Sequence, residues 1–246
     1  MSLLSGTTVS AAQLVSVSKT YPGSPGPVLH NASMDFPTGT MTAVMGPSGS
    51  GKTTLLHCAA GLDRPDTGRV LLGDTDLTAC DESALTELRR RRIGFVFQQF
   101  NLLPMLTAYE NVALPLRLAG RHPKRADVLG ALDRVGLKDI SGRRPAQLSG
   151  GQQQRVAIAR TIAAGPEVVF ADEPTGSLDR ATGRQVIALL RDLVDRDGGT
   201  VIMVTHDPVA AAAADRAYYL VDGRVVDELH HPDVERVTAW LTRWEN

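Results

Sequence analysis

A glycine-rich turn between a short apolar run and a helical pattern is the feature that most constrains the fold of this chain. "MTAVM" (41–45) is the kind of run expected for a strand that is buried on both faces. It leads into "GPSGSGKTT" (46–54), which fits the pattern G-x-x-x-x-G-K-[ST]. Glycines let successive backbone N–H groups turn toward phosphate oxygens, and the N-terminus of a following helix adds a positive partial charge. The pattern therefore favours a phosphate-binding loop over an ordinary glycine-rich turn.

Apolar runs of the same kind recur along the chain and alternate with helical patterns. We expect strands at 14–17, 69–72, 93–97, 168–171 and 200–205. Between the last two, a helical repeat is formed by Val186, Leu189, Leu190, Leu193 and Val194. A strand, a helix and a strand at this spacing predict a parallel α/β core. Extra turns in the first third predict a small antiparallel sheet, and the D-G turn at 221–226 predicts a hairpin.

The length of 246 residues suits one large domain, 1–246, with internal subdivisions. No convincing strand occurs between about 102 and 163, so we predict a helical insertion there. Residues 1–97 and 164–246 should then form the α/β core with its antiparallel β subdomain. Residues 98–163 should form an inserted α-helical subdomain.

Composition and charge argue against several classes of protein. Hydrophobic residues make up 43% of the chain, so a packed core is expected rather than disorder. The net charge of −1 leaves no excess of positive charge for a nucleic-acid backbone, so we expect no nucleic-acid partner. Cys58 and Cys80, without a C-x-x-C motif, indicate no disulfide framework or zinc site and suit a reducing cytoplasm. We expect no signal peptide, and no apolar run approaches the roughly 18 residues that span a bilayer.

Two acidic residues close the apolar run at 168–171. In a phosphate-loop enzyme, Asp172 stands where a carboxylate is needed for Mg²⁺, together with the Thr53 hydroxyl. Glu173 could activate an attacking water as a general base. An acidic helix cap is the alternative, because Asp and Glu are favoured near a helix N-terminus. The upstream loop, whose Lys52 would reach the β- and γ-phosphates, favours the catalytic interpretation.

His206 ends the apolar run at 200–205. A single histidine is often a structural residue. The carboxyl ends of parallel strands are where α/β proteins form their sites, so we favour His206 as a donor to the γ-phosphate.

The stretch "LSGGQQQR" (148–155) starts a helix in an unusual way. Ser149 and Gln152 have the spacing of a capping box. Gly150 and Gly151 then weaken the first turn, since glycine costs roughly 1 kcal/mol against alanine inside a helix. Their presence is explained if backbone N–H groups must approach a phosphate with no side chain in the way. These residues alone do not say whose phosphate it is.

These motifs, in this order, resemble the nucleotide-binding subunit of ATP-binding-cassette (ABC) transporters over most of the chain. The resemblance implies a P-loop NTPase (RecA-like) core, with ATP and Mg²⁺ as cofactors. It assigns nucleotide contacts to Tyr21, Gly46, Pro47, Ser48, Gly49, Ser50, Gly51, Lys52, Thr53, Thr54, Ser149, Gly150, Gly151, Gln152 and Asp179. It assigns catalysis to Glu173, His206, Lys52 and Gln98, and Mg²⁺ to Thr53, Gln98 and Asp172.

Some of these roles rest on the resemblance alone. Tyr21 would stack on adenine, although a tyrosine in a turn needs no such role. Gln98 would touch Mg²⁺ and water and couple the site to the membrane subunit. Without the resemblance, we would interpret Gln98 as an ordinary polar residue at the end of a strand. The segment 177–179, "SLD", would cross a dimer interface. The 148–152 motif would meet the γ-phosphate held by a second chain.

Three longer stretches, 61–70, 93–116 and 172–183, resemble the lipoprotein-release and macrolide-export branch of the family. That branch implies a permease of the FtsX type with few transmembrane helices and a large extracytoplasmic domain, and the family resemblance implies an ATP-dependent homodimer of this chain. The chain would lie in the cytoplasm on the inner face of the membrane, without direct contact with the transported substrate.

Two other classes of function are considered. A soluble ABC ATPase of repair or translation would call for a coiled-coil insertion, zinc cysteines or two cassettes, none of which occurs in this sequence. A regulatory module that only binds ATP should lack an equivalent of Glu173 or His206.

Two surface features complete the predictions. Arg89–Arg92 should end a helix as a solvated face rather than contact lipid or permease. The tail from Asp233 to Trp244 should dock on the core of the chain through one helical face, formed by Val234, Val237, Trp240, Leu241 and Trp244.

Overall fold

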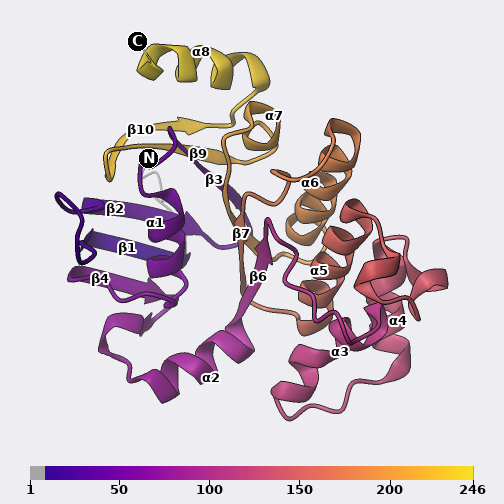
Figure 1. The fold of residues 1–246 in the computed structure, drawn as a ribbon. Helices are drawn as coiled ribbons and strands as arrows, with labels where there is room; N and C mark the ends of the chain where they lie inside the picture. The colour runs from indigo at the N-terminus through magenta and orange to yellow at the C-terminus, as the bar shows by residue number, and fades with distance from the viewer. Residues whose placement is uncertain (1–8, 246) are drawn as a thin grey trace, which may run out of the picture.

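Two sheets organise the chain in the computed structural model, which describes residues 9–245, the side chains of residues 244 and 245 excepted. The first sheet is antiparallel, as expected for the first third of the chain (Figure 1). Its order is β2-β1-β4-β5, with β1 (Ser10–Lys19), β2 (Leu29–Pro37), β4 (Thr67–Leu72) and β5 (Thr75–Asp76).

The second sheet has the order β10-β9-β3-β8-β7-β6. Its strands are β3 (Met41–Met45), β6 (Ile93–Phe97), β7 (Val168–Asp172), β8 (Thr200–Val204), β9 (Arg216–Val221) and β10 (Arg224–His230). All neighbours are parallel except the hairpin β9–β10. The hairpin turns at Asp222 and Gly223, both with positive φ, which is the backbone of the D-G turn predicted for 221–226.

The central strands β3, β7 and β8 of the second sheet are buried on both faces, which explains their continuous apolar sequences. Ala43 and Met45 of β3 face one core cluster, whereas Val44 between them faces the other. The second cluster fills the space between the two sheets and includes helix α1 (Lys52–Ala59). The first cluster joins the opposite face to α5 (Gly150–Ala164) and α6 (Arg180–Asp195).

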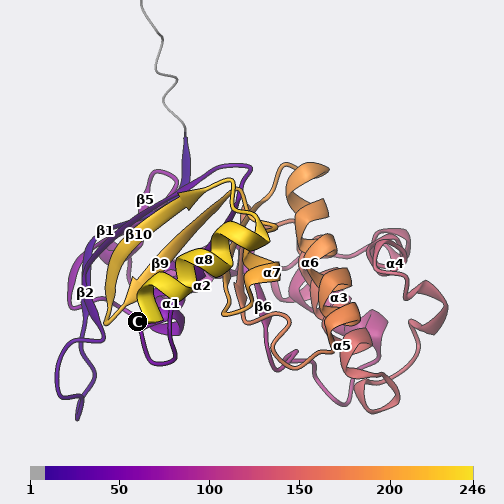
Figure 2. The ribbon, with the colours of Figure 1, turned by 90° about the horizontal axis from the view of Figure 1, so that it is seen from above.

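The described chain between β6 and β7 contains helices and no strand, as predicted. These are α3 (Ala108–Leu118), α4 (Arg125–Arg134), the short 3₁₀ turns Lys138–Ile140 and Pro145–Gln147, and α5. Figures 1 and 2 place α3, α4, α5 and α6 on the side of the second sheet away from the antiparallel sheet. That residues 98–163 behave as a subdomain distinct from residues 1–97 and 164–246 stays a prediction.

Strand β2 has no counterpart in the sequence prediction. Its inward residues Ala32, Met34 and Phe36 alternate with polar residues that face outward. A search for continuous apolar runs therefore passes over it, although alternation at every second residue is itself typical of a half-buried strand.

Helix α8 (Val234–Glu245) docks on the chain's own core, as expected, and lies over the hairpin β9–β10 (Figure 2). Val237 is fully buried and Trp240 is 7% exposed. The Trp240 ring lies 5.0 Å from that of Tyr219, and its Nε1 donates to Asp227 at 2.9 Å. Val234 is 45% exposed, so the face of α8 that docks on the core is narrower than the predicted face. The side chain of Trp244, which the prediction included, lies outside the described residues.

Trp240→Ala should lower the free energy of unfolding by about 3 kcal/mol, because truncating a buried tryptophan leaves a cavity. Trp240→Phe keeps most of the packing and loses the hydrogen bond to Asp227, so it should cost about 1 kcal/mol. Urea unfolding of the three proteins measures both differences. An unchanged midpoint for Trp240→Ala would show that α8 adds nothing to the stability of the core.

The arginine run ends α2 (Glu82–Arg92), as predicted, and its side chains are engaged within the chain. Arg89 pairs with Glu82, while Arg90 and Arg91 pair with Glu87. Arg92 bonds Glu167 at 2.7 Å. That the run makes no contact with lipid or permease stays a prediction.

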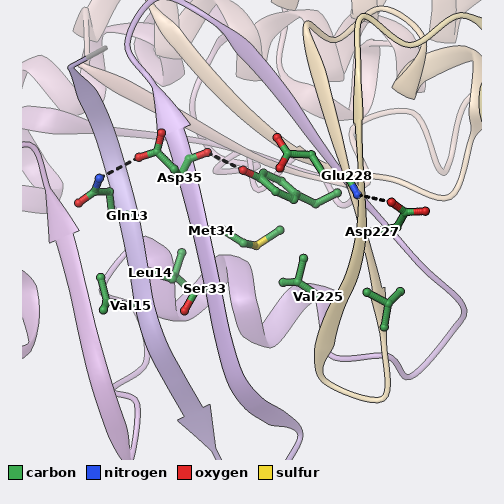
Figure 3. A pocket seen from close by; sticks show the side chains of 11 residues that line it. Gln13, Leu14, Val15, Ser33, Met34, Asp35, Val225, Asp227 and Glu228 are labelled. Carbon is green, nitrogen blue, oxygen red and sulfur yellow. Dashed lines mark hydrogen bonds between the residues drawn. The ribbon is translucent and has the colours of Figure 1, made fainter. Parts of the chain in front are cut away.

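A groove of about 540 Å³ lies where the antiparallel sheet meets the hairpin (Figure 3). Its polar groups are bonded within the chain. Gln13 Nε2 donates to Asp35 at 2.8 Å, and the Tyr218 hydroxyl donates to the Asp35 carbonyl at 3.1 Å. Glu228 pairs with Arg216 at 3.0 Å. The groove is therefore a seam between the sheets, lined by residues other than those of the predicted site.

Candidate functional site

The glycine-rich loop occupies the predicted position between β3 and α1. Gly46 and Gly51 have φ of 150° and 98°. A Cβ atom on Gly46 would lie 2.0 Å from the Leu220 carbonyl oxygen, and one on Gly51 would lie 2.6 Å from that of Val28. Both positions require glycine, because backbone of β9 and of the residue before β2 approaches the loop too closely for a side chain. Pro47, Ser48 and Gly49 form the exposed tip of the loop.

Lys52, the first residue of α1, turns back into this loop. Its Nζ donates to the carbonyl oxygens of Gly46 at 2.9 Å and Pro47 at 2.8 Å. Burial lowers the pKa of Lys52, against the opposing influence of Glu173 and Asp172. The Ser50 hydroxyl is buried, with no hydrogen-bond partner among the described residues. The loop thus holds an ammonium, an unpaired hydroxyl and a helix N-terminus, a set that fits phosphate.

A carboxylate and a hydroxyl meet beside the loop. Asp172 ends β7, and Thr53 lies in the first turn of α1. The Thr53 hydroxyl donates to Asp172 Oδ1 at 3.3 Å, and burial raises the pKa of Asp172. Oxygen donors of these two kinds suit Mg²⁺, which proteins hold through one or two carboxylates plus substrate phosphates.

Glu173 and His206 form a second pair, at the ends of the neighbouring strands β7 and β8. His206 Nδ1 lies 3.0 Å from each carboxylate oxygen of Glu173. The Glu173 side chain is 18% exposed, whereas that of His206 is 71% exposed. The backbone of Glu173 has a φ of 46°, which is uncommon for a residue with a side chain. Its N–H bonds the Val204 carbonyl at 3.0 Å, so β8 holds this conformation.

Gln98 follows β6 at the same edge of the sheet and is exposed. A Cβ on Gly176 would lie 2.8 Å from the Gln98 amide nitrogen, and the Ser177 hydroxyl donates to the Gln98 carbonyl at 3.2 Å. The sheet order explains this gathering. Strands β3, β8, β7 and β6 are consecutive and parallel, so the residues that follow them share one edge.

The capping box at the start of α5 is present as predicted. Gln152 N–H donates to the Ser149 hydroxyl at 3.3 Å, and Ser149 N–H donates to the Gln152 side chain at 2.9 Å. Among residues 9–245, no hydrogen bond or ion pair joins these two residues to the glycine-rich loop. The structure of one chain therefore does not bring the two predicted phosphate-binding elements into contact.

Gly151 has a packing role that the sequence did not reveal. A Cβ on Gly151 would lie 2.3 Å from Cγ2 of Thr182 in α6, whereas one on Gly150 would meet Phe100 at an ordinary 3.5 Å. The missing side chain at 151 therefore allows α5 and α6 to approach.

Asp179 also has a partner within the chain. It caps α6, accepting from the Thr182 hydroxyl at 2.6 Å and from two backbone N–H groups. These hydrogen bonds, led by that of Thr182, lower the pKa of Asp179. Leu178, just before it, is partly buried against the first core cluster.

Gln154 is a residue that the sequence reasoning missed. It is fully buried in α5, and its Nε2 donates to the carbonyl oxygens of Phe97 at 3.2 Å and Pro174 at 2.6 Å. Phe97 immediately precedes Gln98, and Pro174 immediately follows Glu173. The available signal was a polar residue at a core-facing position of α5, where a buried polar group is expected to be hydrogen-bonded. Its Nε2 meets that expectation, whereas its buried Oε1 has no hydrogen-bond partner among the described residues.

Comparison with known proteins decides the family. Residues 29–176 match the family described as ABC transporter. The chain belongs to this family. Like its ATP-binding relatives, this ABC protein binds and hydrolyses ATP. The matches favour a transporter cassette over a soluble ABC ATPase of repair or translation.

The most similar relatives include transport proteins. The lipoprotein-releasing system ATP-binding protein LolD of Anaeromyxobacter dehalogenans is 49% identical over 224 residues, which cover 89% of this chain and 94% of LolD. The macrolide export ATP-binding/permease protein MacB of Salmonella typhimurium is 44% identical over 227 residues, which cover 91% of this chain but 34% of MacB. This ABC chain therefore corresponds to about a third of MacB.

Solved ABC cassettes share the fold. A dimeric structure of the cassette MJ0796 superposes with a TM-score of 0.83 at 43% identity, covering 89% of this chain and 98% of that one. A second dimeric structure, of a post-hydrolysis state bound to ADP and Pi, gives 0.82 at 42% identity, with the same coverage. No helix within residues 9–245 of this ABC chain has the length and apolar character to cross a membrane.

Proposed function

We propose that two copies of this chain enclose two Mg-ATP and drive a membrane permease of the FtsX-like, lipoprotein-release or macrolide-export type. The observation that supports this most is the clustering of Lys52, Asp172 and Glu173 at one edge of the parallel sheet. LolD and MacB, both export or release proteins by name, are among the relatives. The chain is then the ATPase subunit that performs mechanical work on a permease.

The glycine-rich loop, residues 46–54, holds the phosphates of ATP. Its backbone N–H groups, Lys52 and the unpaired Ser50 hydroxyl supply the donors. Mg²⁺ would be held by Thr53, Asp172 and Gln98, and when bound it neutralises charge that develops on the phosphates. The Tyr21 ring provides a platform for adenine.

Hydrolysis requires a base for the attacking water. Glu173 accepts a proton from that water as the water oxygen bonds to the γ-phosphorus, while the bond from the γ-phosphorus to the β,γ-bridging oxygen breaks and ADP leaves. His206, 3.0 Å from Glu173, and Lys52 donate to the γ-phosphate oxygens as negative charge builds up. Because His206 is largely exposed, a second chain can close over this pair.

The second chain contributes the N-terminus of its helix α5, which within the described residues of one chain makes no hydrogen bond or ion pair with the glycine-rich loop. Ser149, Gly150, Gly151 and Gln152 of one copy meet the γ-phosphate held by the other, and the 177–179 segment with Asp179 crosses the interface. The dimeric cassettes of MJ0796 support this arrangement. Gln98 and the helical region 98–163 transmit closure to the permease on the cytoplasmic face of the membrane.

Purification from membranes tests the proposal. The tagged chain, extracted with mild detergent from its native cells, should carry an integral membrane protein in stoichiometric amount. Reconstituted with that protein, it should hydrolyse ATP at an altered rate. Recovery of soluble or nucleic-acid partners only would contradict the proposed transport role.

A further inference from the structure

The hydroxyl of Tyr21 is held by a charged network that the proposed function does not use. Tyr21 Oη donates to Asp63 Oδ2 at 2.6 Å. The other Asp63 oxygen pairs with Lys19 Nζ at 2.8 Å, and Lys19 also donates to the Arg64 carbonyl at 2.7 Å. The three side chains come from the end of β1, the loop that follows it and the loop after α1.

The protonation states of this network suit a fixed tyrosine. Burial opposes a charge on Asp63, yet hydrogen bonds from Lys19 and Tyr21 hold the pKa of Asp63 below its ordinary value. Burial and the bond to Asp63 raise the pKa of Tyr21. Asp63 is therefore an ionised acceptor and Tyr21 a neutral donor near neutral pH, and a charge-assisted hydrogen bond of this kind is stronger than a neutral one.

Lys19 also lies over one face of the Tyr21 ring. Its ammonium lies 5.2 Å from the ring centroid of Tyr21, within the range of a cation–π contact. The Lys19 side chain is 13% exposed, so it is fixed in this position. The hydroxyl is thus tethered and one face of the ring is occupied by a cation, so a flat ligand would stack on the opposite face.

We propose that Asp63 and Lys19 are positioning residues that hold the Tyr21 ring ready to stack on the base of the nucleotide. The inference rests on the proposed role of Tyr21 as the adenine platform. A ring that is already oriented loses less freedom when the base binds, so the network strengthens binding through the base and leaves the phosphate contacts unchanged.

Binding of ADP and of pyrophosphate to the purified chain separates these two contributions, because pyrophosphate has no base. Asp63→Ala should weaken ADP binding about five- to tenfold, a partial loss of a stacking contact. Pyrophosphate binding should change less than about twofold, since only the phosphate loop is involved. Tyr21→Phe, which keeps the ring and removes the tether, should reproduce this pattern, and the double variant should be no weaker than Asp63→Ala alone.

Asp66→Ala is the matched control. Asp66 lies in the same loop, 3.9 Å from Lys19 Nζ, and bonds the Thr20 N–H instead of Tyr21. It should bind ADP as the unmodified chain does. Equal weakening of ADP and pyrophosphate by Asp63→Ala would overturn the proposal in favour of a general structural role.

Tyr21→Ala tests the role of Tyr21 as the adenine platform separately from its positioning by Asp63. If Tyr21→Ala weakens ADP selectively while Asp63→Ala changes nothing, the platform stands and its positioning by Asp63 is refuted. If Tyr21→Ala itself leaves the ratio of ADP to pyrophosphate affinity unchanged, the platform is refuted as well.

Discussion

Glu173→Gln should lower the rate of ATP hydrolysis by about 10²- to 10⁴-fold, the usual cost of losing a general base. The amide has the size of the carboxylate and can still face His206, but it cannot accept the proton of the attacking water. ATP should bind as before, because the phosphate loop is intact. Steady-state phosphate release and equilibrium binding of ATP measure the two effects separately.

Glu235→Gln makes the same chemical change at an exposed position in the first turn of α8 and should keep full activity. Unchanged turnover in Glu173→Gln would remove Glu173 from the reaction. A parallel loss of ATP binding would instead show that the substitution disturbs the nucleotide site itself.

Gly151→Ala should lower ATP hydrolysis by about 10²-fold while ATP still binds to the phosphate loop, because small displacements of groups in a site carry costs of this size. The new Cβ would lie 2.3 Å from Cγ2 of Thr182 and push α5 away from α6. Gly151 and Thr182 lie in the first turns of α5 and α6, next to the capping residues Ser149 and Asp179. Both capping residues belong to the proposed interface with the second chain.

Thr182→Ser decides why glycine is needed at this position. It removes Cγ2 and keeps the hydroxyl that bonds Asp179. The remaining Thr182 atoms would lie 3.5 Å or more from the new Cβ, an ordinary contact. We therefore expect Thr182→Ser alone to be active and the double variant Gly151→Ala/Thr182→Ser to recover most of the lost rate. A double variant as slow as Gly151→Ala would instead show that glycine serves the approach of a phosphate.

Much of the fold was predictable because the central strands of its parallel sheet are buried on both faces and are continuous apolar runs in the sequence. The runs at 93–97 and 168–171 correspond to β6 and β7, and β7 extends one residue further to Asp172. Strand β2 was not predicted, because its polar outward residues interrupt the apolar pattern. A search for apolar residues that alternate with polar ones, in place of continuous apolar runs, would have identified β2.

The candidate site was predictable where a motif lies at the end of a strand. Lys52 and His206 follow β3 and β8, Asp172 ends β7, and the order of these strands in the sheet brings the three residues together. The roles assigned to these three residues remain proposals.

Contacts between distant segments could not be predicted from local pattern. Gly151 meets Thr182, Tyr21 meets Asp63, and Gln154 reaches the carbonyl of Phe97. None of these pairs has a characteristic spacing, because each depends on how helices and loops pack after the strands are in register. A glycine in a motif can therefore have a packing reason that its sequence context does not reveal.

The central claim is that ATP is enclosed between two copies of the chain. The molar mass of Glu173→Gln in solution with Mg-ATP, measured by analytical ultracentrifugation, tests it most directly. We predict the mass of two chains with Mg-ATP and of one chain with ADP. The mass of a single chain under conditions where ATP is shown to be bound would contradict the claim.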